Sequence, residues 1–177
     1  MSASAASGAP VPLVERLSPF DKFLYIVILG MLTAFGPVCT DIYLPALPAI
    51  TRELMTDPAT VQLSLTASFF GLAIGQIFVG PLSDAWGRKG PLLASLVLFA
   101  LTSLGCALAS DVWLLIVMRF FQGCAGSGGV VLSRSMACDM FKGPELTKFM
   151  SLLMTINSLA PIFGPILGSA LITAGSW

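Results

Sequence analysis

The sequence predicts an all-α membrane protein with five transmembrane helices. Hydrophobic residues make up 56% of its 177 residues and charged residues only 10%, whereas soluble domains carry about 25% charged residues. The mean hydropathy is +0.91. Five apolar runs also reach the length of about 20 residues that a helix needs to cross a bilayer. These three observations place the chain among integral membrane proteins.

The five expected spans follow one another with short connections. They cover residues 23–45, 58–82, 91–109, 112–133 and 149–173. Asp57-Pro58 and Gly143-Pro144 each place a capping residue before a proline at the first helical position, and Asp111 can cap the fourth helix. These start signals support the limits of the second, fourth and fifth helices.

Residues 1–20 are rich in Ser, Ala, Gly and Pro and are expected to form a disordered cytoplasmic tail before a transmembrane domain over residues 21–177. The orientation follows from the rule that short loops rich in Lys and Arg stay in the cytoplasm. With the N-terminus inside, Arg52 alone lies outside and Arg119 lies within the membrane. Seven basic residues then lie inside: Arg16, Lys22, Arg88, Lys89, Arg134, Lys142 and Lys148.

The composition argues against several classes of function. Nine basic and nine acidic side chains give a formal net charge of zero, so no basic surplus attracts nucleic acid. The chain has no histidine, the commonest metal ligand and general base. Its cysteines lack C-x-x-C spacing, and no G-x-S-x-G nucleophile motif occurs. We expect no metal, cofactor, nucleic-acid partner or enzymatic activity.

The loop between the second and third spans reads GPLSDAWGRK over residues 80–89. Gly80-Pro81 is expected to end the second helix. Asp84 would lie at the C-terminal end of that helix, where the macrodipole disfavours an anion, so a cation should compensate it. Arg88 and Lys89 are the candidates. The alternative is an ordinary cytoplasmic loop with solvated charges.

Arg119 and Asp41 are the ionisable residues that the spans least easily explain. A charge near the centre of a membrane helix costs about 2.5–3.5 kcal/mol on insertion scales, so it normally faces a cavity or a partner. Arg119 lies about 10 Å from the start of its helix by helical rise. Asp41 lies near the end of the first helix, on the side of the membrane where the fourth helix begins. Arg119 could instead snorkel to the interface, and Asp41 could be an interfacial acid.

Other polar residues in the spans are candidates for lining a cavity. Arg119 and Gln122, three residues apart, share one helix face. Tyr43, Gln76 and Asn157 could line the same space, although an interhelical hydrogen bond of roughly 0.6 kcal/mol is the commoner role. We assign the glycines to close helix packing; they are Gly71, Gly75, Gly123, Gly126, Gly128 and Gly129.

Four segments, in order, resemble motifs of the major facilitator superfamily of transporters. G-x-x-x-D-x-x-G-R-K over 80–89 resembles its loop signature, and TDIYLPALP over 40–48 resembles the first helix of its bicyclomycin and chloramphenicol resistance subfamily. R-x-x-Q-G over 119–123 resembles its fourth-helix motif. The fifth-helix motif of proton-driven antiporters is matched by Pro161, Gly164, Pro165 and Gly168. Ala85, Ala160 and Ser169 depart from the family pattern.

The resemblance implies proton-coupled efflux of drug-like small molecules across the bacterial inner membrane, with protons carried by Asp41 and controlled by Arg119. It also implies that the helices belong to an N-terminal six-helix bundle. Because the sequence stops at Trp177, before a sixth helix, we expect a fragment that lacks the C-terminal half and is inactive alone. The loop residues that would latch the halves are Gly80, Asp84, Gly87, Arg88 and Lys89. The alternative is a structural or assembly membrane subunit without transport activity.

Overall fold

The computed structural model describes residues 18–174, and these residues are helical apart from short connections. Residues 1–17 of the tail expected over residues 1–20, and the chain end at Trp177, lie outside the described residues, whereas Pro19 and Phe20 already belong to the first helix. The helices are α1 (Pro19–Tyr43), the 3₁₀ turn η2 (Leu44–Ala46), α2 (Leu47–Glu53), α3 (Pro58–Trp86), α4 (Lys89–Ala107), α5 (Val112–Met140) and α6 (Gly143–Ala174).

Five helical segments in the described part of the chain are long and apolar enough to cross a membrane. The first of them joins α1, η2 and α2 into one stretch over Phe20–Glu53. The side chain of Asp57 caps α3 by accepting the amide hydrogen of Thr60, and Asp111 caps α5 in the same way. The predicted all-α membrane fold is therefore confirmed.

The end of α3 differs from the prediction. The helix continues through Gly80-Pro81 to Trp86 and ends at Gly87, whose φ of 81° suits a residue without a side chain. Pro81 lacks the amide hydrogen that would bond to the carbonyl of Ile77, four residues before it, and the helix continues without that one bond. Nearby, the Ser83 hydroxyl donates to the carbonyl of Gly80 at 2.8 Å. Asp84 thus belongs to the last turns of the helix.

Other helices also extend past the predicted apolar runs. The first helical stretch continues beyond Pro45 to Glu53, α5 continues beyond Ser133 to Met140, and α6 begins at Gly143, before residue 149. The sequence prediction followed hydropathy, which falls at the membrane surface. A helix can continue there, because its backbone hydrogen bonds do not depend on the surrounding lipid.

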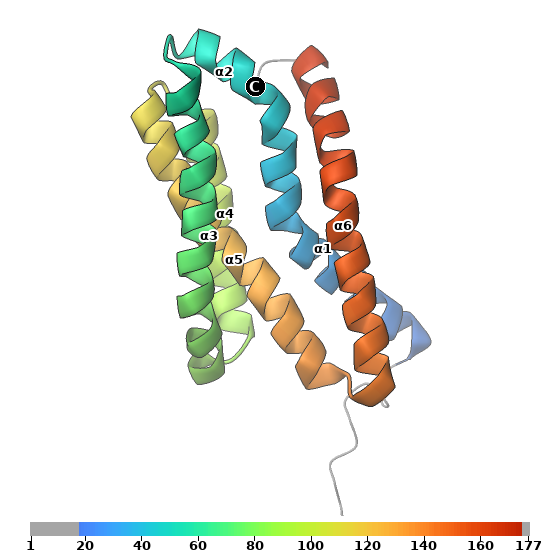
Figure 1. The fold of residues 1–177 in the computed structure, drawn as a ribbon. Helices are drawn as coiled ribbons and strands as arrows, with labels where there is room; N and C mark the ends of the chain where they lie inside the picture. The colour runs from blue at the N-terminus through green and yellow to red at the C-terminus, as the bar shows by residue number, and fades with distance from the viewer. Residues whose placement is uncertain (1–17, 175–177) are drawn as a thin grey trace, which may run out of the picture.

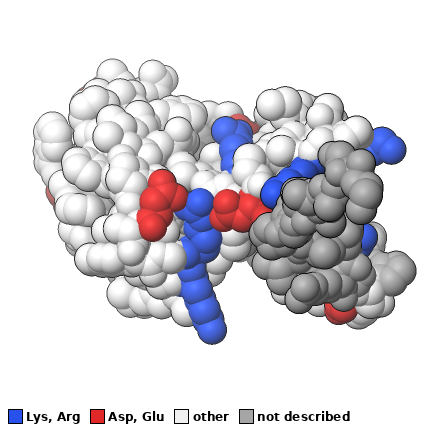
Figure 2. Space-filling model, turned by 90° about the horizontal axis from the view of Figure 1, so that it is seen from below, with Lys and Arg blue, Asp and Glu red and all other residues white. Residues whose placement is uncertain are grey.

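The transmembrane helices alternate in direction, and α1 and α6 lie together on one side of the bundle (Figure 1). α6 packs mainly against α1, whereas α5 packs against α3, α4 and α1. The diagonal α5 therefore connects the α1–α6 pair to the α3–α4 pair. Seen from below, the end of the bundle where α1 begins carries neighbouring basic and acidic side chains near its middle (Figure 2).

The crossing of α3 and α5 depends on glycine. A Cβ atom added at Gly71 would overlap the backbone of Phe120, and one at Gly123 would overlap the backbone of Ser68. A Cβ at Gly75 would lie 2.6 Å from the carbonyl oxygen of Cys124. The predicted packing role of these glycines is confirmed, since any side chain would force the two helices apart.

Buried apolar side chains form two clusters, one toward each end of the bundle. The cluster near α2 includes Tyr43, Ile50 and Leu115. The other cluster, near the start of α6, includes Leu29 and Phe149. The middle of the bundle between them contains the small residues of α5 and the polar residues described next.

Candidate functional site

Arg119 projects from α5 into the middle of the bundle, where two contacts fix its guanidinium group. The group lies over the ring of Tyr43, with Cζ 3.5 Å from the ring centroid, which is a cation–π contact. Its Nη1 donates to Oε1 of Gln122 at 2.9 Å. Its Nε is buried and has no hydrogen-bond partner in the described residues. The predicted shared face of Arg119 and Gln122 is present.

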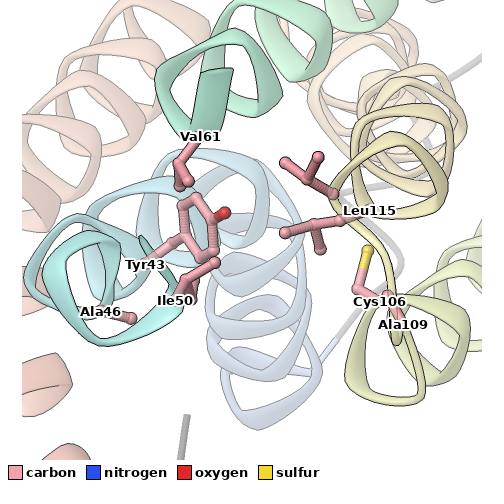
Figure 3. Close-up of a cluster of buried hydrophobic side chains, with 8 residues drawn as sticks. Tyr43, Ala46, Ile50, Val61, Cys106, Ala109 and Leu115 are labelled. Atoms are coloured by element: carbon pink, nitrogen blue, oxygen red, sulfur yellow. The ribbon is translucent and has the colours of Figure 1, made fainter. Parts of the chain in front are cut away.

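Side chains from three other helices hold these two contacts in place. The Tyr43 hydroxyl, on α1, bonds to the Ser64 hydroxyl of α3 at 2.9 Å. Figure 3 shows the Tyr43 ring among the buried side chains of this end of the bundle. Gln122 Nε2 donates to the Ser103 hydroxyl of α4 at 2.7 Å. The orientation of Arg119 is therefore set by α1, α3 and α4 together.

Two cavities, each of about 230 Å³, have Arg119 in their walls. We call them the Asp41 cavity and the Tyr43 cavity after one lining residue of each. Both are lined by Cys39, Arg119 and Gln122. The Asp41 cavity has a mainly apolar wall to which Phe69, Leu72, Phe99 and Pro161 contribute. The wall of the Tyr43 cavity includes Ile42, Ala46, Gly168, Leu171 and Ile172.

Asp41 lines the cavity named after it, but its carboxylate makes no ion pair or hydrogen bond with any residue in the range 18–174. Asp41 and Arg119 thus share a cavity wall without contacting each other as a pair. Within the same range, no three His, Cys, Asp or Glu side chains lie close enough to hold a metal ion. The carboxylate is available to a proton or to a positively charged group of a ligand.

The fifth-helix motif lies against Asp41. A Cβ atom at Gly164 would overlap Cβ of Asp41, and one at Gly168 would overlap the backbone of Ile42. Pro161 lines the Asp41 cavity and Gly168 lines the Tyr43 cavity. Pro161 and Pro165 both lie inside the helix. The motif therefore brings α6 close to the part of α1 that carries the acid.

The other predicted cavity residues are placed differently. Gln122 lines both cavities and Tyr43 lines one, but Gln76 is exposed on α3 and lines neither of them. Asn157 is half-buried on α6 and also lies outside both walls. Its Oδ1 atom is buried and has no hydrogen-bond partner among the described residues.

Several wall residues were not predicted from the sequence. Cys39 belongs to no C-x-x-C motif, and Phe69 and Phe99 have no polar group that could have drawn attention to them. Ser103 lies four residues after Phe99, whose carbonyl accepts its hydroxyl hydrogen at 2.7 Å. A serine with such a bond looks like an ordinary helix residue. Its contact with Gln122 could be predicted only from the way α4 and α5 pack together.

The charged loop forms a second polar cluster, centred on Arg88. Its Nε donates to Asp139 of α5 at 2.9 Å, and its Nη1 contacts Asp84 and the Ser83 hydroxyl. These acids raise the pKa of Arg88, mainly through the bond to Asp139. Lys89 is exposed and makes no ion pair within the described part of the chain. The expected cation for Asp84 is therefore Arg88.

Asp139 was missed because the fourth span was expected to end at residue 133. Its carboxylate connects the loop between α3 and α4 to the last turns of α5. Gly87 ends α3, while a Cβ atom at Gly80 would meet nothing within 4 Å. The positive φ of Gly87 gives a conformational reason for glycine there, and the structure gives none for Gly80.

Long apolar helices that surround cavities with a few polar wall residues, and that carry a charged loop at one end, are typical of a multi-pass membrane protein of the transporter class. The family model described as Major Facilitator Superfamily matches residues 15–177. The chain belongs to this superfamily, whose members are transporters and not enzymes.

Curated relatives cover most of the chain. It is 50% identical over 152 residues to an uncharacterized MFS-type transporter, YdgK, of Bacillus subtilis, with 86% of the chain and 38% of the relative covered. It is 36% identical to a bicyclomycin resistance protein homolog of Haemophilus influenzae, with 89% and 39% covered. It is 33% identical to a chloramphenicol resistance protein of Pseudomonas aeruginosa, with 88% and 35% covered. The chain therefore spans less than two fifths of the length of these relatives.

Proposed function

We propose that the chain contributes the Asp41 and Tyr43 cavities to a proton-coupled exporter of drug-like small molecules. Asp41 would carry the proton, and Arg119 would control whether the proton is held. Two relatives, a bicyclomycin resistance protein homolog and a chloramphenicol resistance protein, support export of small antibiotics as the activity to test first. The cytoplasmic membrane, with the N-terminus inside, is the proposed location.

The observation that carries the proposal is an acid without a partner beside an arginine that is held elsewhere. Asp41 and Arg119 line the same cavity, but the guanidinium group is occupied by the Tyr43 ring and Gln122. A nearby positive charge favours the ionised form of a carboxyl group, whereas a dry surrounding favours the neutral form. Movement of Arg119 toward Asp41 would therefore release a proton, and movement back would allow its uptake.

Alternating access couples that exchange to transport. Helices of such transporters rock as bodies around a site near the middle of the membrane. In this chain the α1–α6 pair carries Asp41, and α5 carries Arg119. A shift of one group of helices against the other would change the distance between the acid and the guanidinium group. The Arg88 cluster connects α3, α4 and α5. It would hold these three helices together while they shift against the α1–α6 pair.

The proposal is tested in proteoliposomes that contain the complete protein. Chloramphenicol or bicyclomycin is added, and proton movement is followed with a pH-sensitive dye inside the vesicles. Asp41→Asn should abolish the proton movement induced by the substrate. Asp57→Asn is the matched control, because Asp57 caps α3 at an exposed position outside both cavities, and asparagine also caps helices well.

Coupled export that persists undiminished in Asp41→Asn would contradict the assignment of this residue. A structural or assembly subunit, the second candidate function, predicts no proton movement for the wild type with any tested compound. Glycine-rich faces such as those of α3, α5 and α6 would also suit packing against partner chains, and this is the one observation that favours the alternative. The unpaired acid inside a cavity has no role in it.

A further inference from the structure

A third cavity, of about 250 Å³, opens at the end of the bundle where α1 and α6 begin. Its wall consists of Lys22 and Ile26 of α1, Glu145, Lys148, Phe149 and Leu152 of α6, and Phe141, which follows α5. We call it the Lys22–Lys148 pocket. It is separate from the Asp41 and Tyr43 cavities, with which it shares no residue.

The polar part of this pocket carries unneutralised positive charge. Neither Lys22 nor Lys148 makes an ion pair with any residue between 18 and 174, although Glu145 is part of the same wall. Two lysines and one glutamate leave one net positive charge. Glu145 lies in the first turn of α6, where the helix dipole already favours an acid. The lysines therefore remain available to an anionic group.

The apolar part lies directly behind the lysines. Ile26 follows Lys22, and Leu152 follows Lys148, by four residues, so each pair lies on one helix face about 6 Å apart along the axis. Both helices start at the same end of the bundle (Figure 1). Each therefore presents a lysine nearer the membrane surface and an aliphatic side chain deeper in the membrane. The rings of Phe141 and Phe149, stacked at 4.7 Å between centroids, add a rigid apolar wall.

We propose that the Lys22–Lys148 pocket binds an anionic phospholipid, with the phosphate between the two lysines and the start of an acyl chain against Ile26 and Leu152. Free phosphate would use the charges but not the apolar layer. The predicted cytoplasmic side of this end supports a lipid, because the inner leaflet carries anionic headgroups that attract basic residues near the surface. The single net charge of the wall matches phosphatidylglycerol, which carries one negative charge.

The test uses the complete protein purified in mild detergent and titrated with phosphatidylglycerol, with bound lipid counted by native mass spectrometry. The double variant Lys22→Gln/Lys148→Gln should bind roughly 30-fold more weakly, at about 1 kcal/mol for each lysine. Lys142→Gln is the matched control, because Lys142 is an exposed lysine before the same helix and does not line the pocket. Its affinity should stay within about twofold of the wild type.

Further arms separate the possible ligands. Glu145→Gln should strengthen binding of phosphatidylglycerol, whereas it should weaken binding if the pocket prefers the ammonium group of phosphatidylethanolamine. Excess inorganic phosphate should displace little lipid. Lys22→Arg/Lys148→Arg keeps the charge and should retain binding, which shows that any loss in the Gln variant is not misfolding. Equal binding by wild type and double Gln variant, equal loss in Lys142→Gln, or full displacement by phosphate would overturn the proposal.

Discussion

The close crossing of α3 and α5 can be tested with the substitution Gly71→Ala. The added methyl group would overlap the carbonyl oxygen of Phe120 and lie 3.0 Å from its carbonyl carbon and 3.1 Å from the amide nitrogen of Cys124. These are backbone atoms, which cannot rotate away as a side chain can. Overpacking of this kind costs about 1–3 kcal/mol. The higher helix propensity of alanine offsets about 1 kcal/mol of that cost.

Gly80→Ala is the matched control on the same helix, because its methyl group would meet nothing within 4 Å. Gly80→Ala therefore gains helix propensity without the cost of overpacking. The free energy of unfolding of Gly80→Ala should therefore exceed that of Gly71→Ala by about 1–3 kcal/mol. Unfolding by sodium dodecyl sulfate in mixed micelles, followed by circular dichroism, measures this difference. It corresponds to roughly a 5- to 150-fold change in the unfolding equilibrium constant.

The same substitution should also affect the candidate site. The Ser68 hydroxyl on α3 donates to the backbone carbonyl of Arg119 at 3.1 Å, and separation of the two helices would lengthen this bond. Gly71→Ala should therefore slow coupled transport as well as lower stability. If both alanine variants unfold at the same detergent fraction, the reasoning from close backbone approach is refuted.

Other predictions concern single side chains. Tyr43→Phe removes the hydroxyl bond to Ser64 and should lower the free energy of unfolding by about 0.6 kcal/mol; Tyr43→Leu also removes the cation–π contact, adding about 0.5–2 kcal/mol. Detergent unfolding of both variants checks that Tyr43→Leu loses more stability than Tyr43→Phe. The bonds from Thr60 lower the pKa of Asp57, so its stabilising contribution is present above the ordinary carboxyl range and is lost as pH falls through the lowered value. Unfolding midpoints of Asp57→Asn should vary less with pH below about 4 than those of the wild type.

Much of the fold was predictable because long apolar runs have few alternatives in a membrane. The face shared by Arg119 and Gln122 followed from helical periodicity, and the close packing of Gly71 and Gly75 followed from their four-residue spacing. The end of α3 was not predictable in the same way. Pro81 signalled a break, but the helix loses only one backbone hydrogen bond there and continues to Trp86.

The details of the site depended on how the helices are rotated against one another. A polar residue in a span can face a cavity, a neighbouring helix or the outside, and hydropathy does not distinguish these cases. Gln76 lies on the outside, although it is as polar as Gln122. Likewise, the preference of Arg119 for the Tyr43 ring over Asp41 depends on side-chain geometry that appears only when α1 and α5 are placed side by side.

Because Arg119 forms a common wall of two cavities, molecules in these cavities need not touch each other to influence each other. A solute that displaces the guanidinium group from one side changes the volume and the charge on the other side. Two ligands of different shape could thus show mutual inhibition without occupying the same space. Kinetic competition alone would then be a poor measure of whether two compounds share a binding position.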